Sequence, residues 1–462
     1  MIELDAKTLA DWLPQQRWFG AKDRAIASVA VRDVVSLHDE WPQLVRALVD
    51  VSLADAGDGP ASTSTYQVLI GARPPVEPMD FLQTHDAAVL GPVDTDAGDG
   101  IAYDATLDGE LGLLLLPLVV AGESASLVRP LGAEQSNTSL VYDDRIILKV
   151  FRHLADGPNR DVEVTTRLAE VGFAHVAEPL GTLSVDGRDL AFAQRFLAGG
   201  ADGWTLALTS LRDLFAANDT TQLPVIDPNA PMPDMDPGDA GGDFAHEAER
   251  LGVMTAELHA SMAEAFGRER ADLDAWLAPM RAQVARTRHP DVDDGRVRGL
   301  LDQLGSVKDA GVAIRIHGDY HLGQVMRTDT GWFVLDFEGE PARPLEERQA
   351  VASPLKDVAG MLRSFHYASQ VGLRDRGGVD DGSCVELAEA WETRNREAFL
   401  DGYWPAAGEA GLVPSSPVAR DAVLAAFELD KAVYELAYEL SHRPEWVAIP
   451  LAAISRLVEG AR

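Results

Sequence analysis

Two short strings near residue 320 carry the side chains with the clearest chemical potential. The first is His317-Gly318-Asp319, with Gln324 five positions after the aspartate, and the second is Asp336-Phe337-Glu338. Each string follows an apolar run that is typical of a strand, and a turn separates the two runs. We therefore expect two carboxylates at the ends of two adjacent strands, joined by a loop that carries an amide.

Phosphoryl transfer calls for this set of groups. One carboxylate must accept or orient the proton of the attacking hydroxyl, and a second carboxylate with a side-chain oxygen must hold Mg²⁺ against the phosphates. Protein kinases supply these parts as H-R-D with Asn five residues later, followed by D-F-G. Here the spacing agrees, while Gly318 replaces Arg, Gln324 replaces Asn and Glu338 replaces the last Gly. Two surface turn acids are the competing interpretation, and the complete string argues against it.

The other half of an ATP site is expected upstream, around Lys149. This lysine interrupts the apolar strand Ile146–Phe151. Kinases use a strand lysine, paired with a glutamate of the next helix, to hold the α- and β-phosphates. Glu163 falls in the helix predicted over 160–171 and is the natural partner. An ordinary edge-strand charge is the competing interpretation for Lys149.

Two further segments complete the predicted ATP site. The segment Glu134–Ser139 lacks a glycine-rich phosphate motif, but its hydroxyl and backbone N–H groups could contact phosphate. After the strand Leu190–Phe196 the chain enters its helical part, so backbone groups of Gln194–Leu197 are expected to bind adenine. The predicted ATP-binding residues are Gln135, Ser136, Asn137, Thr138, Lys149, Glu163, Gln194 and Phe196.

The elements that must position these residues divide the chain into three parts. Residues 1–120 contain strands near 29–35 and 66–70 and show no chemistry of their own. Residues 121–198 read as strands, one helix and more strands, and include a hairpin over 139–151. Residues 199–462 are mostly helical, interrupted by a Pro-, Asp- and Gly-rich loop at 217–242. The sequence therefore predicts an α+β protein with a β-rich first half and a helical second half.

Composition narrows the possible ligands. The 462 residues include 74 acids and 40 Lys and Arg, which gives a net charge of −34. Such a charge repels a phosphate backbone and an anionic membrane, so nucleic-acid and membrane binding are not expected. The single cysteine, Cys384, excludes an internal disulfide and fits a cytoplasmic location. The longest apolar run, Leu111–Ala121, is too short to span a bilayer.

Taken together, three strings of this chain resemble the actinobacterial maltokinases. They are H-G-D-x-H-L-G-Q-V from His317, L-D-F-E-G-E-P-x-R-P from Leu335 and S-P-L-x-D-V-A-G-M-L-R-S-F from Ser353. Further segments extend the resemblance over nearly the whole chain: Gln15–Trp18, Ala133–Ser139, Ile147–Arg152 and Lys431–Pro444. The resemblance implies a bilobal fold like that of protein kinases and aminoglycoside phosphotransferases. It would consist of an N-terminal cap (1–120), an intermediate β-rich ATP-binding subdomain (121–198) and a helical C-lobe (199–462).

The resemblance also implies an activity and residue roles. The activity is ATP- and Mg²⁺-dependent phosphorylation of the anomeric hydroxyl of maltose, giving maltose 1-phosphate for α-glucan and glycogen synthesis, with trehalose synthase as a partner. Asp319 matches the catalytic base, Gln324 and Asp336 match the Mg²⁺ ligands, and Glu338 is a further acid beside them. The substrate-binding residues would be His317, Arg343, Lys431, Tyr434 and Glu435. Simple helix packing is the competing interpretation for the last three, and Arg363 is expected to be a structural ion-pair partner.

Three other functions compete with that of a maltokinase. The first is another small-molecule kinase of the same fold, above all a glucosamine kinase. A glucosamine kinase would need extra carboxylates around its ammonium substrate, and Lys431 argues against a cationic acceptor. A non-catalytic kinase-like module would lack a catalytic part, whereas Lys149, Glu163, Asp319, Gln324 and Asp336 are all present. A protein Ser/Thr kinase is disfavoured because no A-P-E string follows Asp336.

Overall fold

A computed structural model describes residues 2–22, 24–54, 63–132, 137–217, 243–340, 345–376 and 382–460. The chain divides into two compact units. The N-terminal unit comprises Met1–Thr166 and Ala177–Ala198, and the C-terminal unit comprises Arg167–Val176 and Gly199–Arg462. Apart from Ala217, the acidic loop expected at 217–242 lies outside the described residues.

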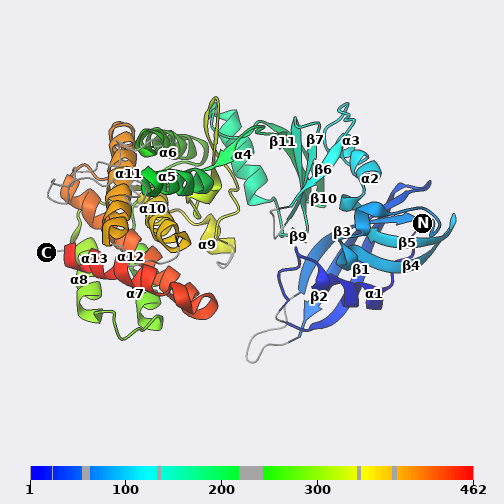
Figure 1. Cartoon of the computed structure of the whole chain (residues 1–462), viewed down its shortest axis with the longest axis horizontal. Helices are drawn as coiled ribbons and strands as arrows, with labels where there is room; N and C mark the ends of the chain where they lie inside the picture. The colour runs from blue at the N-terminus through cyan, green and yellow to red at the C-terminus, as the bar shows by residue number, and fades with distance from the viewer. Residues whose placement is uncertain are drawn as a thin grey trace, which may run out of the picture. The chain divides into compact units, whose positions relative to one another are not determined.

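The N-terminal unit begins with a six-stranded antiparallel sheet, whose strands from the first 105 residues are drawn in shades of blue in Figure 1. Its main path runs β1 (Ile26–His38), β2 (Gln43–Leu53), β3 (Thr63–Arg73), β5 (Gly98–Asp104) and β4 (Val89–Thr95), and β9 (His153–Leu154) pairs with β3. Helix α1 (Ala6–Trp12) places Leu9 and Trp12 in the apolar core beside this sheet. The strands predicted near 29–35 and 66–70 are thus confirmed as parts of β1 and β3.

A second antiparallel sheet completes this unit. Its order is β10 (Pro179–Val185), β11 (Arg188–Arg195), β8 (Ile146–Phe151), β7 (Asn137–Tyr142) and β6 (Val128–Leu131). The predicted hairpin is β7–β8, and its turn residues Asp143 and Asp144 have φ values of 49° and 51°, as a tight hairpin turn requires. Buried Arg152 joins the two sheets, because its guanidinium donates to Asp104 of the first sheet and to Thr138 of the second. Helices α2 (Gly109–Leu113) and α3 (Leu116–Val119) precede the second sheet, and α4 (Arg160–Glu170) follows β9.

The C-terminal unit is helical (green to red in Figure 1), as the sequence predicts. Its central helix is α10 (Leu355–Asp375), which packs on α5 (Gly203–Ala217), α11 (Gly382–Glu409) and α12 (Pro417–His442). Helix α6 (Ala245–Phe266) lies against α11 at glycines, since a Cβ on Gly252 would come within 2.0 Å of the Phe399 carbonyl oxygen. The remaining helices are α7 (Leu273–Arg286), α8 (Asp294–Ser306), α9 (Leu345–Gln349) and α13 (Ala448–Gly460).

Two small sheets in the C-terminal unit carry the segments that precede the two predicted acids. β14 (Val312–Ala313) pairs with β13 (Glu269–Arg270), and β15 (Val325–Thr328) pairs with β12 (Ala201–Asp202) and β16 (Gly331–Val334). The expectation that the two acids end adjacent strands is therefore wrong. Strand pairing depends on distant partners, here β13 and β12, which the local pattern does not reveal.

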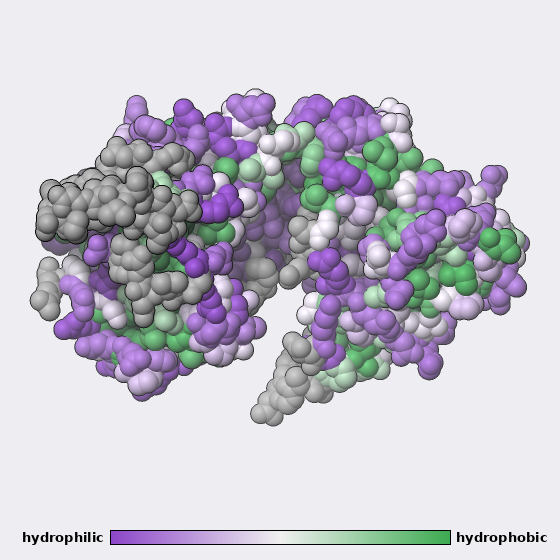
Figure 2. All heavy atoms as spheres, viewed as in Figure 1, coloured by the Kyte–Doolittle hydropathy of each residue, from purple (hydrophilic) through white to green (hydrophobic). Residues whose placement is uncertain are grey.

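Among the described residues, hydrophilic side chains cover most of the coloured face of each unit in Figure 2, with smaller apolar areas between them. Within the described ranges, no helix has the length and apolar character needed to cross a membrane.

Candidate active site

The loop that carries Asp319 is held by helix α10. The carboxylate of Asp357 accepts hydrogen bonds from the backbone N–H groups of His317 at 2.7 Å and Gly318 at 2.9 Å. Burial opposes ionisation of Asp357, but the hydrogen bond from His259 and the charges nearby outweigh it and hold the pKa of Asp357 below its usual value. This buried anion therefore fixes the backbone just before Asp319.

Two further positions on the same face of α10 contact this loop. A Cβ on Gly360 would lie 2.6 Å from the carbonyl oxygen of Tyr320, so only glycine allows the helix to approach so closely. The Ser364 hydroxyl accepts a hydrogen bond from the Leu322 N–H at 3.1 Å. Residues 357, 360 and 364 share one helix face because they are three and four positions apart.

His317 holds the loop from the other side and does not face a substrate. The side chain is fully buried, Nε2 lies 2.9 Å from the carbonyl oxygen of Leu335, and Nδ1 lies 3.3 Å from the backbone nitrogen of Asp319. These contacts assign the Nε2–H tautomer, which donates to Leu335 and accepts from Asp319. The predicted substrate role of His317 is wrong, because both ring nitrogens are used inside the protein.

The two predicted metal ligands lie on segments that are hydrogen-bonded to each other. The backbone carbonyl oxygen of Gln324 accepts a hydrogen bond from the backbone N–H of Leu335 at 2.9 Å. Asp336 directly follows Leu335 in the chain. Asp336 has a φ of 57°, and its Oδ1 accepts from the Glu338 N–H at 3.3 Å. A carboxylate and an amide oxygen are suitable ligands for Mg²⁺, which usually takes its remaining ligands from phosphates and water.

A cavity of about 500 Å³ opens beside Asp319. Its volume lies within the range of roughly 300–1,000 Å³ that is usual for ligand pockets. Helices α10 and α12 supply much of its wall, and the predicted residues Lys431, Tyr434 and Glu435 all belong to the lining. The aromatic lining residues are Trp204, Tyr367, Tyr434, Tyr438 and Trp446, and the charged ones are Asp319, Glu340, Lys431, Glu435, Glu439 and Arg443. We call this cavity the acceptor pocket.

Lys431 connects two carboxylates that line the acceptor pocket. Its Nζ lies 2.8 Å from Glu340 Oε1 and 3.6 Å from Asp319 Oδ1. Burial disfavours the charge of Lys431, but Glu340 and Asp319 overcome this and hold the pKa of Lys431 above its usual value. His321 lies on the other side of this carboxylate, with its Nε2 3.9 Å from Asp319 Oδ2, and burial lowers the pKa of His321 below its usual value. A fixed cation therefore lies next to the predicted catalytic base.

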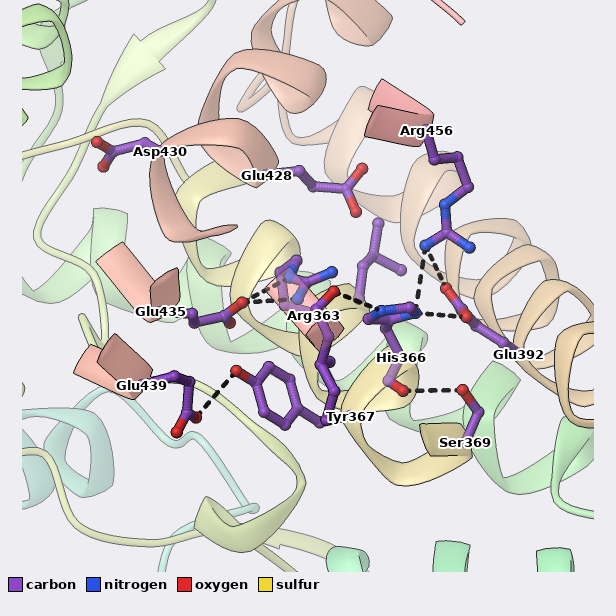
Figure 3. A network of polar contacts seen from close by, with 12 residues as sticks. Arg363, His366, Tyr367, Ser369, Glu392, Glu428, Asp430, Glu435, Glu439 and Arg456 are labelled. Carbon is purple, nitrogen blue, oxygen red and sulfur yellow. Dashed lines mark hydrogen bonds and ion pairs between the residues drawn. The ribbon is translucent and has the colours of Figure 1, made fainter. Parts of the chain in front are cut away.

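Two ion pairs hold the other carboxylates of the wall, and Figure 3 shows the pair of Arg363 with Glu435 and the contact of Tyr367 with Glu439. Arg363 donates through Nε and Nη2 to Glu435 Oε2 at 2.9 and 2.7 Å, which confirms the expected ion-pair role of Arg363. Tyr367 donates to Glu439 at 3.1 Å, and Arg443 donates to both oxygens of Glu439 at 2.7 and 2.8 Å. Sequence reasoning missed the roles of Glu340, Tyr367 and Glu439 here. Glu439 could have been found by extending the Lys431–Glu435 spacing by one helical turn.

In the N-terminal unit, Lys149 pairs with Asp161, a partner not predicted from the sequence. Lys149 Nζ lies 2.8 Å from Asp161 Oδ2, and both side chains are largely buried. Asp161 and Glu163 both lie on α4, two positions apart, so they face nearly opposite sides of the helix. Asp161 is on the buried side, whereas Glu163 is partly exposed.

The other predicted ATP contacts are placed as follows. Asn137 and Thr138 lie in β7, and the Thr138 hydroxyl accepts from Arg152 at 2.9 Å. Gln194 lies in β11, and the backbone N–H of Phe196 donates to the Arg145 carbonyl at 2.8 Å, so this N–H is already bonded within the protein. Gln135, Ser136 and the predicted substrate residue Arg343 lie outside the described residues.

Comparison with protein families finds two matching domains. Residues 12–108 match the maltokinase N-terminal cap domain, and residues 226–400 match the phosphotransferase enzyme family. The chain therefore contains one segment similar to the maltokinase cap and one similar to the phosphotransferase enzyme family. The predicted α+β fold, related to aminoglycoside phosphotransferases and preceded by an N-terminal cap, is confirmed.

Similar curated proteins include two glucosamine kinases. The protein from Mycolicibacterium smegmatis is 27% identical over 409 residues, covering 81% of this chain and 94% of the relative. The protein from Streptacidiphilus jiangxiensis is 27% identical over 357 residues, covering 73% and 74%. A solved structure of a glucosamine kinase in complex with glucosamine, ADP and inorganic phosphate superposes with a TM-score of 0.65. The two sequences are 20% identical, and the superposition covers 99% of this chain and 100% of the glucosamine kinase chain. The similarity of fold therefore extends over both chains.

Proposed function

We propose that the chain is an ATP-dependent sugar kinase that phosphorylates the anomeric hydroxyl of maltose, giving maltose 1-phosphate and ADP. The observation that carries this proposal is that Asp319 lines the acceptor pocket together with Lys431, Tyr434 and Glu435. Sugars combine hydroxyl groups with apolar ring faces, and the lining offers both charged and aromatic side chains.

Each site residue has a role in this proposal. Asp319 accepts the proton of the anomeric hydroxyl as its oxygen attacks the γ-phosphate. Gln324 and Asp336 would hold Mg²⁺, which neutralises charge on the phosphates. Lys149, oriented by Asp161, binds the phosphates of ATP. Lys431 hydrogen-bonds the reacting ring and keeps its own charge through Glu340.

The charges of the acceptor pocket favour a neutral sugar. Among the described lining residues, each of the four carboxylates has a cation within 4 Å: Asp319 and Glu340 have Lys431, Glu435 has Arg363, and Glu439 has Arg443. An ammonium group would have to compete with one of these internal cations, and a buried charge without a partner is costly. We therefore place maltose ahead of glucosamine.

Glucosamine is retained as the second candidate acceptor because both curated relatives are glucosamine kinases. ADP release from Mg²⁺-ATP, measured with maltose, glucose, trehalose, glucosamine or no acceptor, distinguishes the two. We expect turnover with maltose. Turnover with glucosamine and not with maltose would overturn the proposed acceptor while retaining the kinase.

The physiological setting rests on the family resemblance alone. We propose a cytoplasmic enzyme whose product enters α-glucan and glycogen synthesis and whose partner is trehalose synthase. Co-purification of trehalose synthase with the tagged full chain would test the partnership, and its absence from the eluate would count against it.

A further inference from the structure

We infer that the N-terminal cap sets the affinity of the chain for ATP through Arg152, which acts as a positioning residue for Lys149. The cap, residues 12–108, contains strands β1 to β5 of the first sheet. Arg152 lies outside the cap and directly follows β8, the strand that carries Lys149. The inference rests on the proposed function, in which Lys149 binds the phosphates of ATP.

The first support is the set of groups that the Arg152 guanidinium binds. Its Nη2 donates to both carboxylate oxygens of Asp104 at 2.8 and 2.9 Å and to the Thr106 hydroxyl at 3.0 Å, and both partners belong to the cap. The guanidinium carbon lies 4.8 Å from the centre of the Trp18 ring, within the range of a cation–π contact. Its Nε donates to the Thr138 hydroxyl of β7 at 2.9 Å. One side chain therefore binds the cap on one side and a strand of the second sheet on the other.

The second support is the backbone that leads from Lys149 into the first sheet. β8 ends at Phe151, and β9, which begins two residues later, pairs with β3 of the cap. Gln67 of β3 is buried and binds this connection twice. Its backbone N–H donates to the Arg152 carbonyl at 2.8 Å, and its side-chain Nε2 donates to the Phe151 carbonyl at 2.9 Å. The end of the strand that carries Lys149 is therefore held by the cap through backbone as well as side-chain groups.

The third support is the short path from Arg152 to the predicted nucleotide contacts. In the ladder between β7 and β8, Ser139 lies opposite Lys149. Thr138, whose hydroxyl binds Arg152, directly precedes Ser139 and is itself a predicted ATP contact. A displacement of the Arg152 guanidinium therefore shifts both strands beside Lys149.

The fourth support is the burial of the ion pair between Arg152 and Asp104. The Arg152 side chain is 0% exposed and the Asp104 side chain is 6% exposed. Removing two charges from water is so costly that apolar residues of the same volume often stabilise a protein equally well. Stability alone therefore does not account for this pair. A planar guanidinium fixes the direction of each of its partners, so its contribution is a defined placement of the strands that it joins.

The test measures calorimetric binding of Mg²⁺-ADP and the melting temperature of matched variants of the full chain. Arg152→Lys keeps the charge but loses the planar fork that reaches both sheets. We expect its Kd for Mg²⁺-ADP to rise about 10-fold, as is usual when a charged group such as Lys149 no longer reaches its hydrogen-bond partner. Arg73→Lys is the control, because Arg73 of β3 also pairs with a buried aspartate, Asp108 at 2.8 Å, which precedes the second sheet. We expect Arg73→Lys to lower the melting temperature and to leave the Kd unchanged.

A second variant tests the inference if Arg152→Lys does not fold. Thr106→Val removes a hydroxyl that binds Arg152 and keeps the ion pair with Asp104. Thr106 belongs to the cap and has no proposed contact with nucleotide. We expect the Kd of Thr106→Val for Mg²⁺-ADP to rise about 3-fold, the effect of losing one hydrogen bond.

The double variant Lys149→Met/Asp161→Asn separates this inference from the proposed function. Weaker Mg²⁺-ADP binding in the double variant, with an unchanged Kd in Arg152→Lys and Thr106→Val, would overturn the positioning role alone. An unchanged Kd in the double variant would overturn the proposed role of Lys149 and this inference with it. A rise in the Kd of Arg73→Lys equal to that of Arg152→Lys would indicate a general loosening of the cap and would also overturn the role of Arg152.

Discussion

The imidazole Nε2 of His317 lies 2.9 Å from the carbonyl oxygen of Leu335, the residue that precedes Asp336. The same ring accepts the backbone N–H of Asp319 at Nδ1. One buried side chain therefore links the backbone at the proposed base to the backbone at the proposed metal ligand. The relative position of the two carboxylates depends on this ring, because the strands that precede them belong to different sheets.

Replacing His317 with Gln should therefore reduce turnover without a matching change in acceptor binding. Gln cannot bridge both backbones with the geometry of the ring, and a misplacement of about 1 Å can cost roughly 100-fold in rate. We expect kcat to fall about 100-fold while the calorimetric affinity for maltose stays near that of the wild type. The exposed His246→Gln on α6 is the control. An unchanged kcat in His317→Gln would refute the positioning role.

The Asp319→Asn variant should fold normally and lose its catalytic base. Asn occupies the same space but cannot accept the hydroxyl proton, and general-base contributions are typically about 10²–10⁴-fold. We expect kcat to fall within that range, with an unchanged melting temperature. Asp329→Asn, in the exposed turn of the β15–β16 hairpin, should retain full activity. Near-wild-type turnover of Asp319→Asn would remove Asp319 from the mechanism.

The Lys149–Asp161 pair should contribute to both stability and ATP binding. Lys149→Met leaves the buried Asp161 carboxylate without its cation, and removing one partner of a buried pair typically costs about 3–5 kcal/mol. The double variant Lys149→Met/Asp161→Asn should recover much of that stability in urea unfolding, yet keep a raised KM for ATP. If Glu163 were the main partner of Lys149, Glu163→Gln would strongly change the stability in urea or the KM for ATP. Such a change would contradict the assignment to Asp161.

Glu392 should make the stability of the C-terminal unit depend on pH. Burial opposes its charge, but hydrogen bonds from His366 and Arg456 hold the pKa of Glu392 at about 2 (Figure 3). Because this pKa is below the ordinary value of 4.5, the stabilisation is fully present above about pH 4.5 and is lost as pH falls towards 2. The lowered pKa corresponds to about 3 kcal/mol.

Urea unfolding at pH 7, 5 and 3.5 tests this linkage. We expect Glu392→Gln to be most destabilising at pH 7 and 5 and less so at pH 3.5. Glu389→Gln, at an exposed position of the same helix, should have little effect at any of these values. A penalty for Glu392→Gln that is equal at pH 7 and 3.5 would show that the carboxylate charge is not what stabilises this region.

Local patterns predicted the parts of the site that lie close together in sequence. The string from His317 to Glu338 is continuous in sequence, so Asp319, Gln324 and Asp336 could be proposed together from the residue types and spacing of that string. Likewise, Lys431, Tyr434 and Glu435 are three and four positions apart, and the structure places all of them in the acceptor pocket. Short-range geometry is readable from sequence because it depends on helix and turn periods.

Features that depend on distant contacts could not be predicted in this way. The helix period alone did not show that Asp161 faces Lys149, because the packing of α4 decides which side is buried. His317 was expected to bind substrate because the sequence does not show that its ring contacts the backbone at Leu335 and Asp319. Those contacts depend on tertiary structure. Trp204 and Trp446 carry no motif and join the pocket only through the arrangement of helices.

Helix α10 contacts the Asp319 loop at three positions, Asp357, Gly360 and Ser364, and this spacing constrains the length of the chain. Adding or deleting one residue between Asp357 and Ser364 would rotate every later side chain by about 100° around the helix axis. Ser364 would then turn away from Leu322, and Arg363 and Tyr367 would leave their partners on α12. Surface loops accept changes in length readily. In this stretch of α10, by contrast, only substitutions are compatible with the contacts, and at Gly360 almost no other residue fits.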